Sequence, residues 1–551
     1  MKRKVSVYAI FTIAPLILLA IHVYFFITVD HQKYGINTDP DYAYLLSAID
    51  ISRLGKSKMV LHPGTTYQLL AHLVMRCAYY LHGDSAADDF PTSVIKYPTF
   101  YLNALQGAFS ALNIILVFII GVLTYSFTQK VLAGLFFQFT PFLSPQIVIF
   151  GFRKVTTDTL LVFISLIMMI LLLKRLQAGK FGRDRKEIYI FSVLFGIVVG
   201  FGLATKITFL PLAVLPFFII PGFLPAVLYI AAAVMAVIVF TIPIIPQYPT
   251  FFKFLYLIST HRGIYGHGDK SILDIDDYSL GLFLVIKENI PFIIIFLVSI
   301  AVLVLVYSRR RLKKIPGTPA RDIRSRLLLG VMAVQIIGIL FVARHFKSKY
   351  LIPELCLGTL ALYLVYLQRE QFYRGAKLPA PAAPMVKKRF TWRGAVCIFL
   401  GVFSFLHTLQ GISDFQRSRS EKLEEAMRIE KKLNGEFKDY CVVYYYNASS
   451  VIFGLEFGDQ WTPLYGDLLN RVYGEKYFYN NKGHYIFSWG RGKKKRIPLE
   501  KLKTRCNNKV LFFGTPFPEL YRKVAIPMPQ YPLTDVFGGK YVTIYTLNAE
   551  R

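Results

Sequence analysis

Long apolar segments recur along this chain of 551 residues, and they restrict its fold more than any other feature. A helix needs about 20 apolar residues to cross the hydrocarbon core of a bilayer, and eleven segments are predicted to do so. These segments cover residues 6–28, 100–125, 130–150, 157–174, 188–205, 207–221, 223–245, 282–307, 327–343, 350–368 and 394–411. The hydrophobic share of 54% agrees with this prediction. We therefore expect a polytopic α-helical membrane protein.

The formal net charge is +31. In a soluble protein such an excess would suggest a nucleic-acid partner, but here the basic residues mostly separate apolar segments, so we expect none. Three loops, 174–187, 309–326 and 369–393, carry six, eight and seven Lys or Arg. All three lie on the cytoplasmic side if the N-terminus does. This predicts an integral protein of the inner or plasma membrane with a cytoplasmic N-terminus. Its first segment follows MKRK without a small-residue cleavage site, so we expect a retained anchor rather than a removed signal peptide.

The composition divides the chain into two parts. Residues 1–411 form the apolar core, which contains a long first extracytoplasmic loop at residues 29–99. Residues 412–551 are more polar and are predicted to form an extracytoplasmic α/β domain, with an initial polar helix and strands at CVVYYY, VLFFG and YVTIYTL. Only two of the five cysteines, Cys441 and Cys506, lie in this polar part. We expect them to form a disulfide, because the compartment is predicted to be oxidising.

Two acids follow the first apolar segment directly, in the stretch NTDPDYAYLLSAIDI. Asp39 and Pro40 fit the first positions of a helix, with Asp39 as the N-cap and Asp41 in the first turn. The apolar residues that follow have helical spacing, and we expect this helix to lie along the membrane surface. A carboxylate held there could instead be a general base or a metal ligand. Capping and catalysis both stay open for these two acids.

Basic and aromatic residues gather in the predicted outer loops, against the trend that places positive charge inside. Binding of a phosphate would explain them, because Arg and Lys are its usual partners. The alternative is that they are snorkelling anchors at helix ends. The motifs are HPGTTYQLL, FRKVTTDTLL, ATKITFLPL, HRGIYGHGDKS and ARHFKSKYLIP. The candidate substrate-binding residues are His62, Arg153, Lys206, His261, Tyr265, His267, Arg344, His345, Lys347, Lys349 and Tyr350.

In order and sidedness, these motifs resemble those of the GT-C superfamily of membrane glycosyltransferases, within it the branch of protein O-mannosyltransferases and aminoarabinose transferases. The segment DPD stands where the family has an acidic pair in its first outer loop. HPGTTYQLL resembles the family's segment a short way downstream, and TTDTLL resembles the acidic position before the fourth span. RHFKSKYLIP resembles the late element near the donor phosphate. The resemblance covers roughly residues 1–370, and the acids here are Asp-x-Asp rather than adjacent Asp-Glu.

This resemblance implies transfer of a sugar from a polyprenyl-phosphate donor to a lipid, glycan or protein acceptor on the outer face, with inversion at the anomeric carbon. Asp41, with Asp39 as the second choice, would orient or deprotonate the acceptor. The leaving phosphate would be stabilised by cations, which are Arg344, Lys347, Lys349 and Lys206. Some relatives use a divalent metal ion and others do not. If Mg or Mn acts here, Asp41 and Asp158 would hold it.

Two other functions stay open at the level of sequence. An O-antigen polymerase or ligase also spans the membrane many times and uses a lipid-linked donor, but it would be expected to depend on outer Arg and His rather than on a first-loop DxD. A lipid or polysaccharide transporter, or a scaffold without catalysis, is the other alternative. Transporters place acids and broken-helix pairs within the membrane, and the apolar segments of this chain contain few acids.

Overall fold

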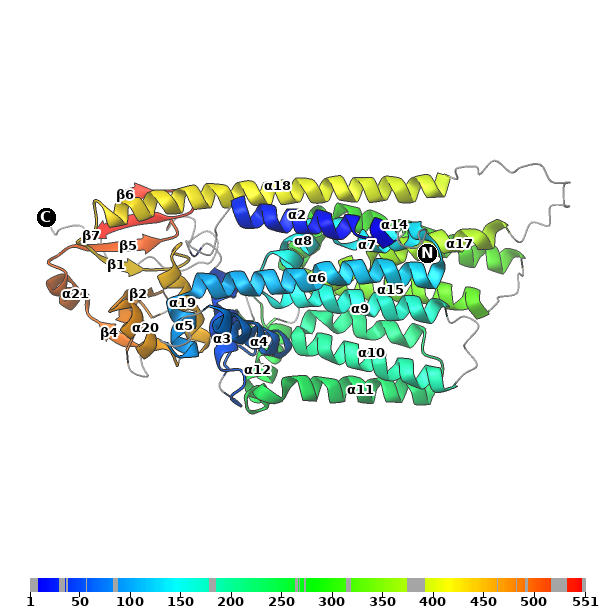
Figure 1. Cartoon of the computed structure of the whole chain (residues 1–551), viewed down its shortest axis with the longest axis horizontal. Coiled ribbons are helices and arrows are strands. Elements are labelled where there is room, and N and C mark those ends of the chain that lie inside the picture. Colours follow the sequence, from blue (N-terminus) through cyan, green and yellow to red (C-terminus); the bar gives the residue numbers. More distant parts are fainter. Residues whose placement is uncertain are drawn as a thin grey trace. The chain divides into compact units, whose positions relative to one another are not determined.

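A computed structural model gives the fold of the chain (Figure 1). It describes residues 8–28, 35, 38–55, 57–82, 88–177, 185–262, 266, 268–271, 274–313, 319–373, 392–462, 464–481, 483–490, 494–516 and 533–547. Helices make up most of these residues, and the strands all lie after residue 440. This is the predicted combination of a polytopic helical protein with a C-terminal α/β domain.

Nine helical segments within these ranges are long and apolar enough to cross a membrane. They contain the helices α2 (Ile13–Thr28), α6 (Pro98–Thr128), α9 (Thr157–Gln177), α10 (Arg185–Thr205), α11 (Phe223–Thr241), α14 (Ile290–Lys313), α15 (Pro319–Ala343), α17 (Gly358–Tyr373) and α18 (Trp392–Asn434). The shorter apolar helices around them are α7 (Val131–Gln138), η2 (Thr140–Leu143), α8 (Pro145–Phe152), η4 (Ile207–Phe218), η5 (Ile242–Gln247), α12 (Tyr248–Thr260), α13 (Ile275–Glu288), η7 (Ser348–Leu351) and α16 (Ile352–Cys356).

Two of the eleven predicted segments differ from this pattern. Residues 131–152 fold as α7, η2 and α8 rather than as one helix, because Pro141 and Pro145 remove backbone donors and favour helix starts. Residues 207–218 form the 3₁₀ helix η4, which contains Pro211 and Pro216. The sequence prediction therefore located the apolar segments correctly but missed how proline divides two of them.

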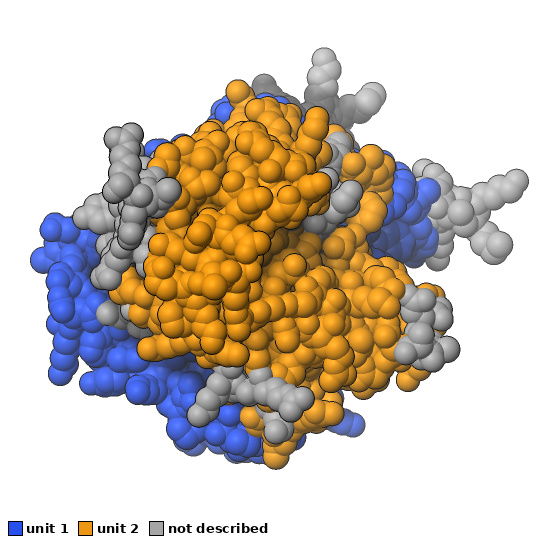
Figure 2. Space-filling model, turned by 90° about the vertical axis from the view of Figure 1, so that its left-hand side faces the viewer, with its two compact units in different colours: residues 1–22, 60–67, 109–413 blue, residues 23–59, 68–108, 414–551 orange. Residues whose placement is uncertain are grey.

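The chain divides into two compact units, coloured separately in Figure 2. Unit 1 contains residues 1–22, 60–67 and 109–413, which include most of the apolar helices. Unit 2 contains residues 23–59, 68–108 and 414–551. Segments of the predicted first outer loop thus belong to the same unit as the C-terminal domain.

The C-terminal part of unit 2 is built on a seven-stranded mixed sheet in the order β4-β3-β2-β1-β5-β7-β6. The strands are β1 (Cys441–Tyr444), β2 (Tyr477–Asn480), β3 (Tyr485–Ser488), β4 (Lys495–Ile497), β5 (Val510–Gly514), β6 (Leu533–Gly538) and β7 (Thr543–Leu547). Central β1 pairs in parallel with both β2 and β5, and the remaining pairs are antiparallel. The helices of this part are α19 (Val451–Trp461), α20 (Gly466–Tyr473) and α21 (Leu499–Arg505). All three predicted strands are confirmed, as β1, β5 and β7.

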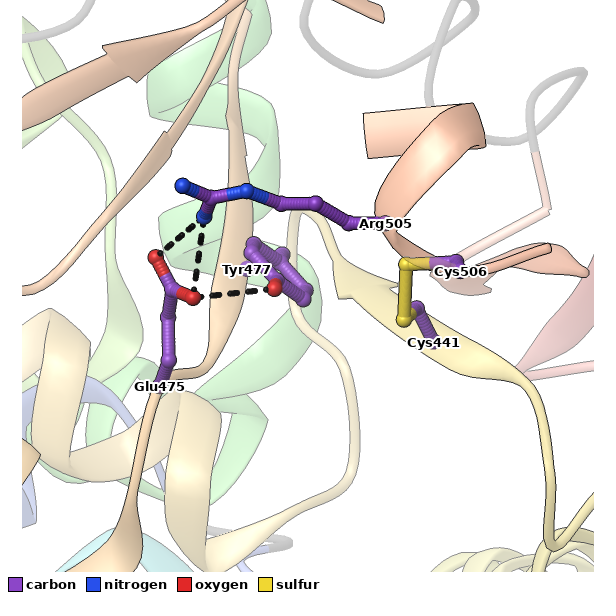
Figure 3. Close-up of a disulfide and its surroundings, with 5 residues drawn as sticks. All are labelled: Cys441, Glu475, Tyr477, Arg505 and Cys506. Carbon is purple, nitrogen blue, oxygen red and sulfur yellow. Dashed lines mark hydrogen bonds and ion pairs between the residues drawn. A yellow bond between two sulfur atoms is a disulfide. The ribbon is translucent and has the colours of Figure 1, made fainter. Parts of the chain in front are cut away.

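The expected disulfide is present between Cys441 and Cys506, whose Cα atoms lie 5.9 Å apart (Figure 3). It joins the first residue of β1 to the residue that follows α21. Beside it, the Glu475 carboxylate accepts hydrogen bonds from Arg505 and from the Tyr477 hydroxyl. The covalent and polar links together hold α21 against the sheet.

Unit 2 also contains two helices from the first outer loop, α3 (Thr38–Ile49) and α5 (Phe90–Lys96), and α4 (Thr65–Leu81) from residue 68 onward. Within α3, every residue from 41 to 50 is buried, and the helix packs against α19. The helix was predicted correctly, and protein rather than lipid covers it. Its expected position along the membrane surface stays a prediction. The predicted polar helix after residue 412 exists as well, as a continuation of α18.

Candidate functional site

Asp158 and Lys206 form a buried ion pair inside unit 1. Asp158 lies in the first turn of α9, where the helix dipole favours a negative charge. Lys206 lies between α10 and η4 with an extended backbone (φ −164°, ψ 135°). Its Nζ donates to Oδ1 of Asp158 at 2.6 Å, and neither side chain is more than 2% exposed. In a buried pair of this kind, each charge compensates for the loss of water around the other, so removing one partner would leave an unpaired buried charge.

Further predicted residues surround this pair. Nζ of Lys349, in η7, lies 3.9 Å from Oδ2 of Asp158. The ring of Tyr350 lies 4.6 Å from Nζ of Lys206 and contacts the ring of His62 at a centroid distance of 6.2 Å. We call these five residues the Asp158 cluster. It brings together side chains that are up to 288 positions apart in the sequence, between His62 and Tyr350.

Burial and the neighbouring lysines fix the protonation of the cluster. Burial, together with the charge of Lys206, lowers the pKa of His62 to about 3. The imidazole is therefore neutral at physiological pH. Burial also lowers the pKa of Lys206 to about 8, against the opposing effect of Asp158. Lys206 is thus still mainly protonated at pH 7 and keeps its attraction for anions.

The segment that carries His62 is anchored by two contacts within unit 1. The hydroxyls of Thr66 and Thr205 form a hydrogen bond of 2.6 Å at the end of α10. The ring of Tyr67 stacks on that of Phe109 at 4.5 Å. These contacts hold residues 60–67 beside Lys206, the residue that follows Thr205. The sequence offered no signal for the Thr66–Thr205 bond, because single threonines at helix ends are common.

Other predicted cations lie close to the cluster or near its helices. The charge of Lys347 acts on both His62 and Lys206. Arg153 ends α8 and is buried. Its neighbour Lys154 is buried as well, and the Lys154 carbonyl accepts a hydrogen bond from the Thr159 hydroxyl in α9. Three buried cations, Arg153, Lys154 and Lys206, therefore lie on or next to the helices of the Asp158 cluster, which itself contains one carboxylate.

A second group of predicted residues lies at the ends of α12 and α15. Arg344 donates to the carbonyl of Ser271 at 3.4 Å, and a ring nitrogen of His345 lies 3.0 Å from the carbonyl of Ile258. Nδ1 of His261 lies 2.9 Å from the Thr260 hydroxyl. The hydrogen bonds of Arg344 and His345 thus go to backbone carbonyls, and that of His261 goes to a neighbouring hydroxyl, rather than to the Asp158 cluster. Two further candidates, Tyr265 and His267, lie outside the described residues.

The two candidate acids of the first loop belong to unit 2. Asp39 is exposed, and its extended backbone (φ −103°, ψ 123°) is that of a residue before the first helical turn. Asp41 is fully buried. The charge of Arg419, in α18, interacts with that of Asp41. The burial of Asp41 exceeds what capping requires, whereas the exposure of Asp39 is compatible with a capping role alone.

A divalent metal ion does not fit the Asp158 carboxylate. Oδ1 accepts from Lys206, and Oδ2 accepts from the Thr156 hydroxyl at 3.1 Å with Lys349 beyond it. Two ammonium groups already balance the carboxylate and would repel a second cation. Within the described ranges, no group of three His, Cys, Asp or Glu side chains could hold a metal. No chemical step is therefore assigned to a metal at Asp158.

Among the buried acids that the sequence analysis missed is Glu354 in α16, within unit 1. Both of its carboxyl oxygens are buried without a hydrogen-bond partner among the residues that the structure describes. Its side chain packs so closely on Gly338 that a Cβ there would lie 2.6 Å from Oε1. A signal was available, because Glu354 is an acid within the predicted apolar segment 350–368.

No family model and no curated protein matches this chain. Among solved structures, the chain is similar to a member of the class that its motifs resemble, the GT-C membrane glycosyltransferases. That structure is the crystal structure of ArnT from Cupriavidus metallidurans bound to undecaprenyl phosphate. The sequences are 13% identical, the TM-score is 0.42, and the match covers 96% of this chain and 97% of that one. At this TM-score the likeness is a similarity only, and the function proposed below rests on the side chains of this chain.

Proposed function

We propose that this protein is an integral-membrane glycosyltransferase that takes its sugar from a polyprenyl-phosphate donor. One observation carries the proposal. The Asp158 cluster holds the ammonium groups of Lys206 and Lys349, with Lys347 close enough to act on it, against a single carboxylate. Such an excess of positive charge around one buried carboxylate, in an apolar helical unit, suits an anion that arrives from the membrane. A lipid phosphate has this chemistry.

The roles of the residues follow from their charge and burial. Lys349 is partly exposed, so it can contact a phosphate oxygen, whereas Asp158 holds Lys206 in position. These cations would stabilise the negative charge that develops on the phosphate as the bond to the anomeric carbon breaks. Neutral His62 can donate or accept one hydrogen bond without adding charge. Asp41 is the proposed base for the acceptor hydroxyl or amine, with inversion at the anomeric carbon.

The donor site is tested by binding of undecaprenyl phosphate without a sugar. Saturation at 100 times Kd should stabilise the detergent-solubilised protein by about 2.7 kcal/mol, measured as a rise in melting temperature. Lys349→Gln should lose most of this rise and keep the melting temperature of the unbound protein, because its side chain is 20% exposed. Lys96→Gln is the matched control, since Lys96 pairs with Asp88 on the surface of unit 2. An equal rise in the wild type, Lys349→Gln and Lys96→Gln would show that the phosphate does not bind at the Asp158 cluster.

The reaction is tested with a panel of undecaprenyl-phosphate sugars and membrane lipids as acceptors, by following sugar release or transfer. Asp41→Asn should lower transfer by at least the ~100-fold typical of a lost general base. Asp39→Asn should stay active if Asp39 only begins the helix, because Asn caps about as well as Asp. If Asp39→Asn alone is inactive, the base is Asp39. If the wild-type protein binds undecaprenyl phosphate but uses no donor, the transporter alternative is favoured.

A further inference from the structure

The helix that carries Asp41 is held along its length by α19 of the C-terminal domain, within unit 2 (Figure 1). The two segments run in the same direction, and they meet at three successive places. Gly35 lies against Ser450, Tyr42 lies against Gly454 and Gly458, and Asp50 bonds to Tyr465 just beyond α19.

The first contact lies just before α3. Gly35 adopts a positive φ of 61°, a conformation that L side chains rarely adopt. A Cβ at this position would lie 2.4 Å from the carbonyl oxygen of Ser450. Ser450 is itself fixed, because its hydroxyl accepts from the backbone N–H of Ile452 as the N-cap of α19. The chain that enters α3 therefore passes in backbone contact with the first residue of α19.

The second contact lies next to Asp41. A Cβ on Gly454 would lie 2.7 Å from the ring of Tyr42, and a Cβ on Gly458 would lie 2.6 Å from the Tyr42 carbonyl oxygen. Glycines four positions apart lie on one helix face, and their missing side chains let two backbones approach closely. The backbone of Tyr42 thus rests on α19 one residue away from the predicted base.

The third contact is a hydrogen bond at the end of α3. The Tyr465 hydroxyl donates to Oδ2 of Asp50 at 2.6 Å. Both residues are buried, and Asp50 is also 3.5 Å from the exposed Arg53 guanidinium. Hydrogen bonds to a charged acceptor are among the stronger ones in proteins. This bond fixes the C-terminal end of α3 against the loop between α19 and α20.

We propose that α19 and Tyr465 are a positioning device for Asp41, so that the C-terminal domain takes part in sugar transfer without touching the substrate. This inference rests on the proposed function of Asp41. Contacts before, beside and after the acid leave α3 little freedom to shift or rotate. A general base must lie within hydrogen-bond reach of the acceptor proton, and a displacement near 1 Å can cost about 100-fold in rate.

The test compares two tyrosines of the same domain. Tyr465→Phe removes the bond to α3, whereas Tyr473→Phe removes a hydroxyl that donates to the Ile95 carbonyl of α5 at 2.8 Å. Hydrogen exchange should rise within residues 42–50 in the first variant and within residues 90–97 in the second. Only Tyr465→Phe should lower kcat, by about ten-fold or more, with KM for the donor changed by less than two-fold.

Two further variants separate positioning from general stability. Gly458→Ala should displace α3 at Tyr42 and lower kcat, whereas Gly107→Ala in α6 should not, since nothing lies within 4 Å of a Cβ there. Asp50→Asn combined with Tyr465→Phe should lose no more activity than the larger single loss, because both remove one interaction. Unchanged exchange in residues 42–50 and normal kcat in Tyr465→Phe and Gly458→Ala would overturn the positioning role. An inactive wild-type protein would instead refute the proposed function, while the exchange result would still decide whether α19 holds α3.

Discussion

Asp459 should make the C-terminal domain less stable as the pH rises, and Asp459→Asn should remove this effect. The carboxyl group is buried in α19, and Oδ1 accepts from the backbone N–H of Tyr465 at 3.1 Å. Burial, together with the nearby charge of Glu456, raises its pKa from 3.8 to about 7. Lys494 donates to Glu456 rather than to Asp459. The charge of Lys494 therefore offsets only part of the cost of ionising Asp459.

The size of the effect follows from the difference in pKa. A raised carboxyl pKa means that the folded protein holds its proton more tightly than the unfolded chain, so stability falls as the pH rises from 3.8 to about 7. At ~1.4 kcal/mol per pH unit, the whole interval corresponds to about 4 kcal/mol, and the part between pH 5 and pH 7 to about 3 kcal/mol. Asn keeps an acceptor for the Tyr465 N–H and carries no charge. The variant should match the wild type near pH 4 and exceed it above pH 7.

The assay is thermal unfolding in detergent between pH 4 and pH 9, followed by tryptophan fluorescence. Trp489 is a suitable reporter, because its indole N–H donates to Glu456 at 2.7 Å. Asp467→Asn is the matched control, since Asp467 is exposed in the first turn of α20 of the same domain. Parallel pH profiles for the wild type and Asp459→Asn would refute the reasoning and place the pH sensitivity on another group.

Two further predictions concern the disulfide and the topology. Replacing both Cys441 and Cys506 with serine should lower the free energy of unfolding of the C-terminal domain by about 2–5 kcal/mol, measured by denaturant unfolding, and a stability equal to that of the wild type would contradict this. A periplasmic or extracellular reporter fused after residue 412 should be active, whereas the same reporter inserted in the basic loop 174–187 should be inactive; the opposite pattern would invert the proposed orientation.

The sequence predicted elements well where the pattern is local. Apolar runs located the membrane helices, and short runs of apolar and aromatic residues located β1, β5 and β7. The sequence could not predict contacts between distant segments, because no local pattern encodes them. Asp158 and Lys206 could be named as candidates, but their pairing depends on how α9 and α10 pack. The burial of α3 against α19 was missed for the same reason, since an amphipathic helix can cover protein as well as lipid.

The glycines of α19 show where more could have been predicted. Gly454 and Gly458 stand four residues apart in VIFGLEFGDQW, a spacing typical of closely packed helices. The motif indicates a helix partner but not which helix. Only the fold identifies Tyr42 as that partner, and with it the link between the C-terminal domain and the acidic stretch. The sequence therefore contains both segments of this contact, but it does not show that they pack against each other.

The distribution of Lys and Arg among the loops also indicates whether the two divided segments, residues 131–152 and 207–218, cross the membrane. Suppose that the nine long segments each cross the membrane once. If residues 207–218 failed to cross, the basic loop at 174–187 would lie on the opposite side from the loops at 309–326 and 369–393. If only residues 131–152 failed to cross, the three loops would share one side, but that side would be opposite the basic MKRK segment. Only crossing by both segments places the three loops and MKRK on one side, as the tendency of Lys and Arg to collect on the cytoplasmic side favours. The charge pattern thus favours eleven crossings, two of them by divided helices.

The structure supplies what a divided helix needs in order to cross. Backbone groups freed at a break must be satisfied by protein, because lipid offers no hydrogen bonds. At the break after α7, the Thr140 hydroxyl donates to the Phe137 carbonyl, and the Phe142 carbonyl accepts from Thr408 in α18 at 2.9 Å. Residues 131–152 could reach about 30 Å at the rise of a helix. In η4 the 3₁₀ rise of ~2.0 Å extends 12 residues to about 24 Å. The prolines that divide these segments therefore shorten the helices without preventing either segment from spanning most of the hydrocarbon core.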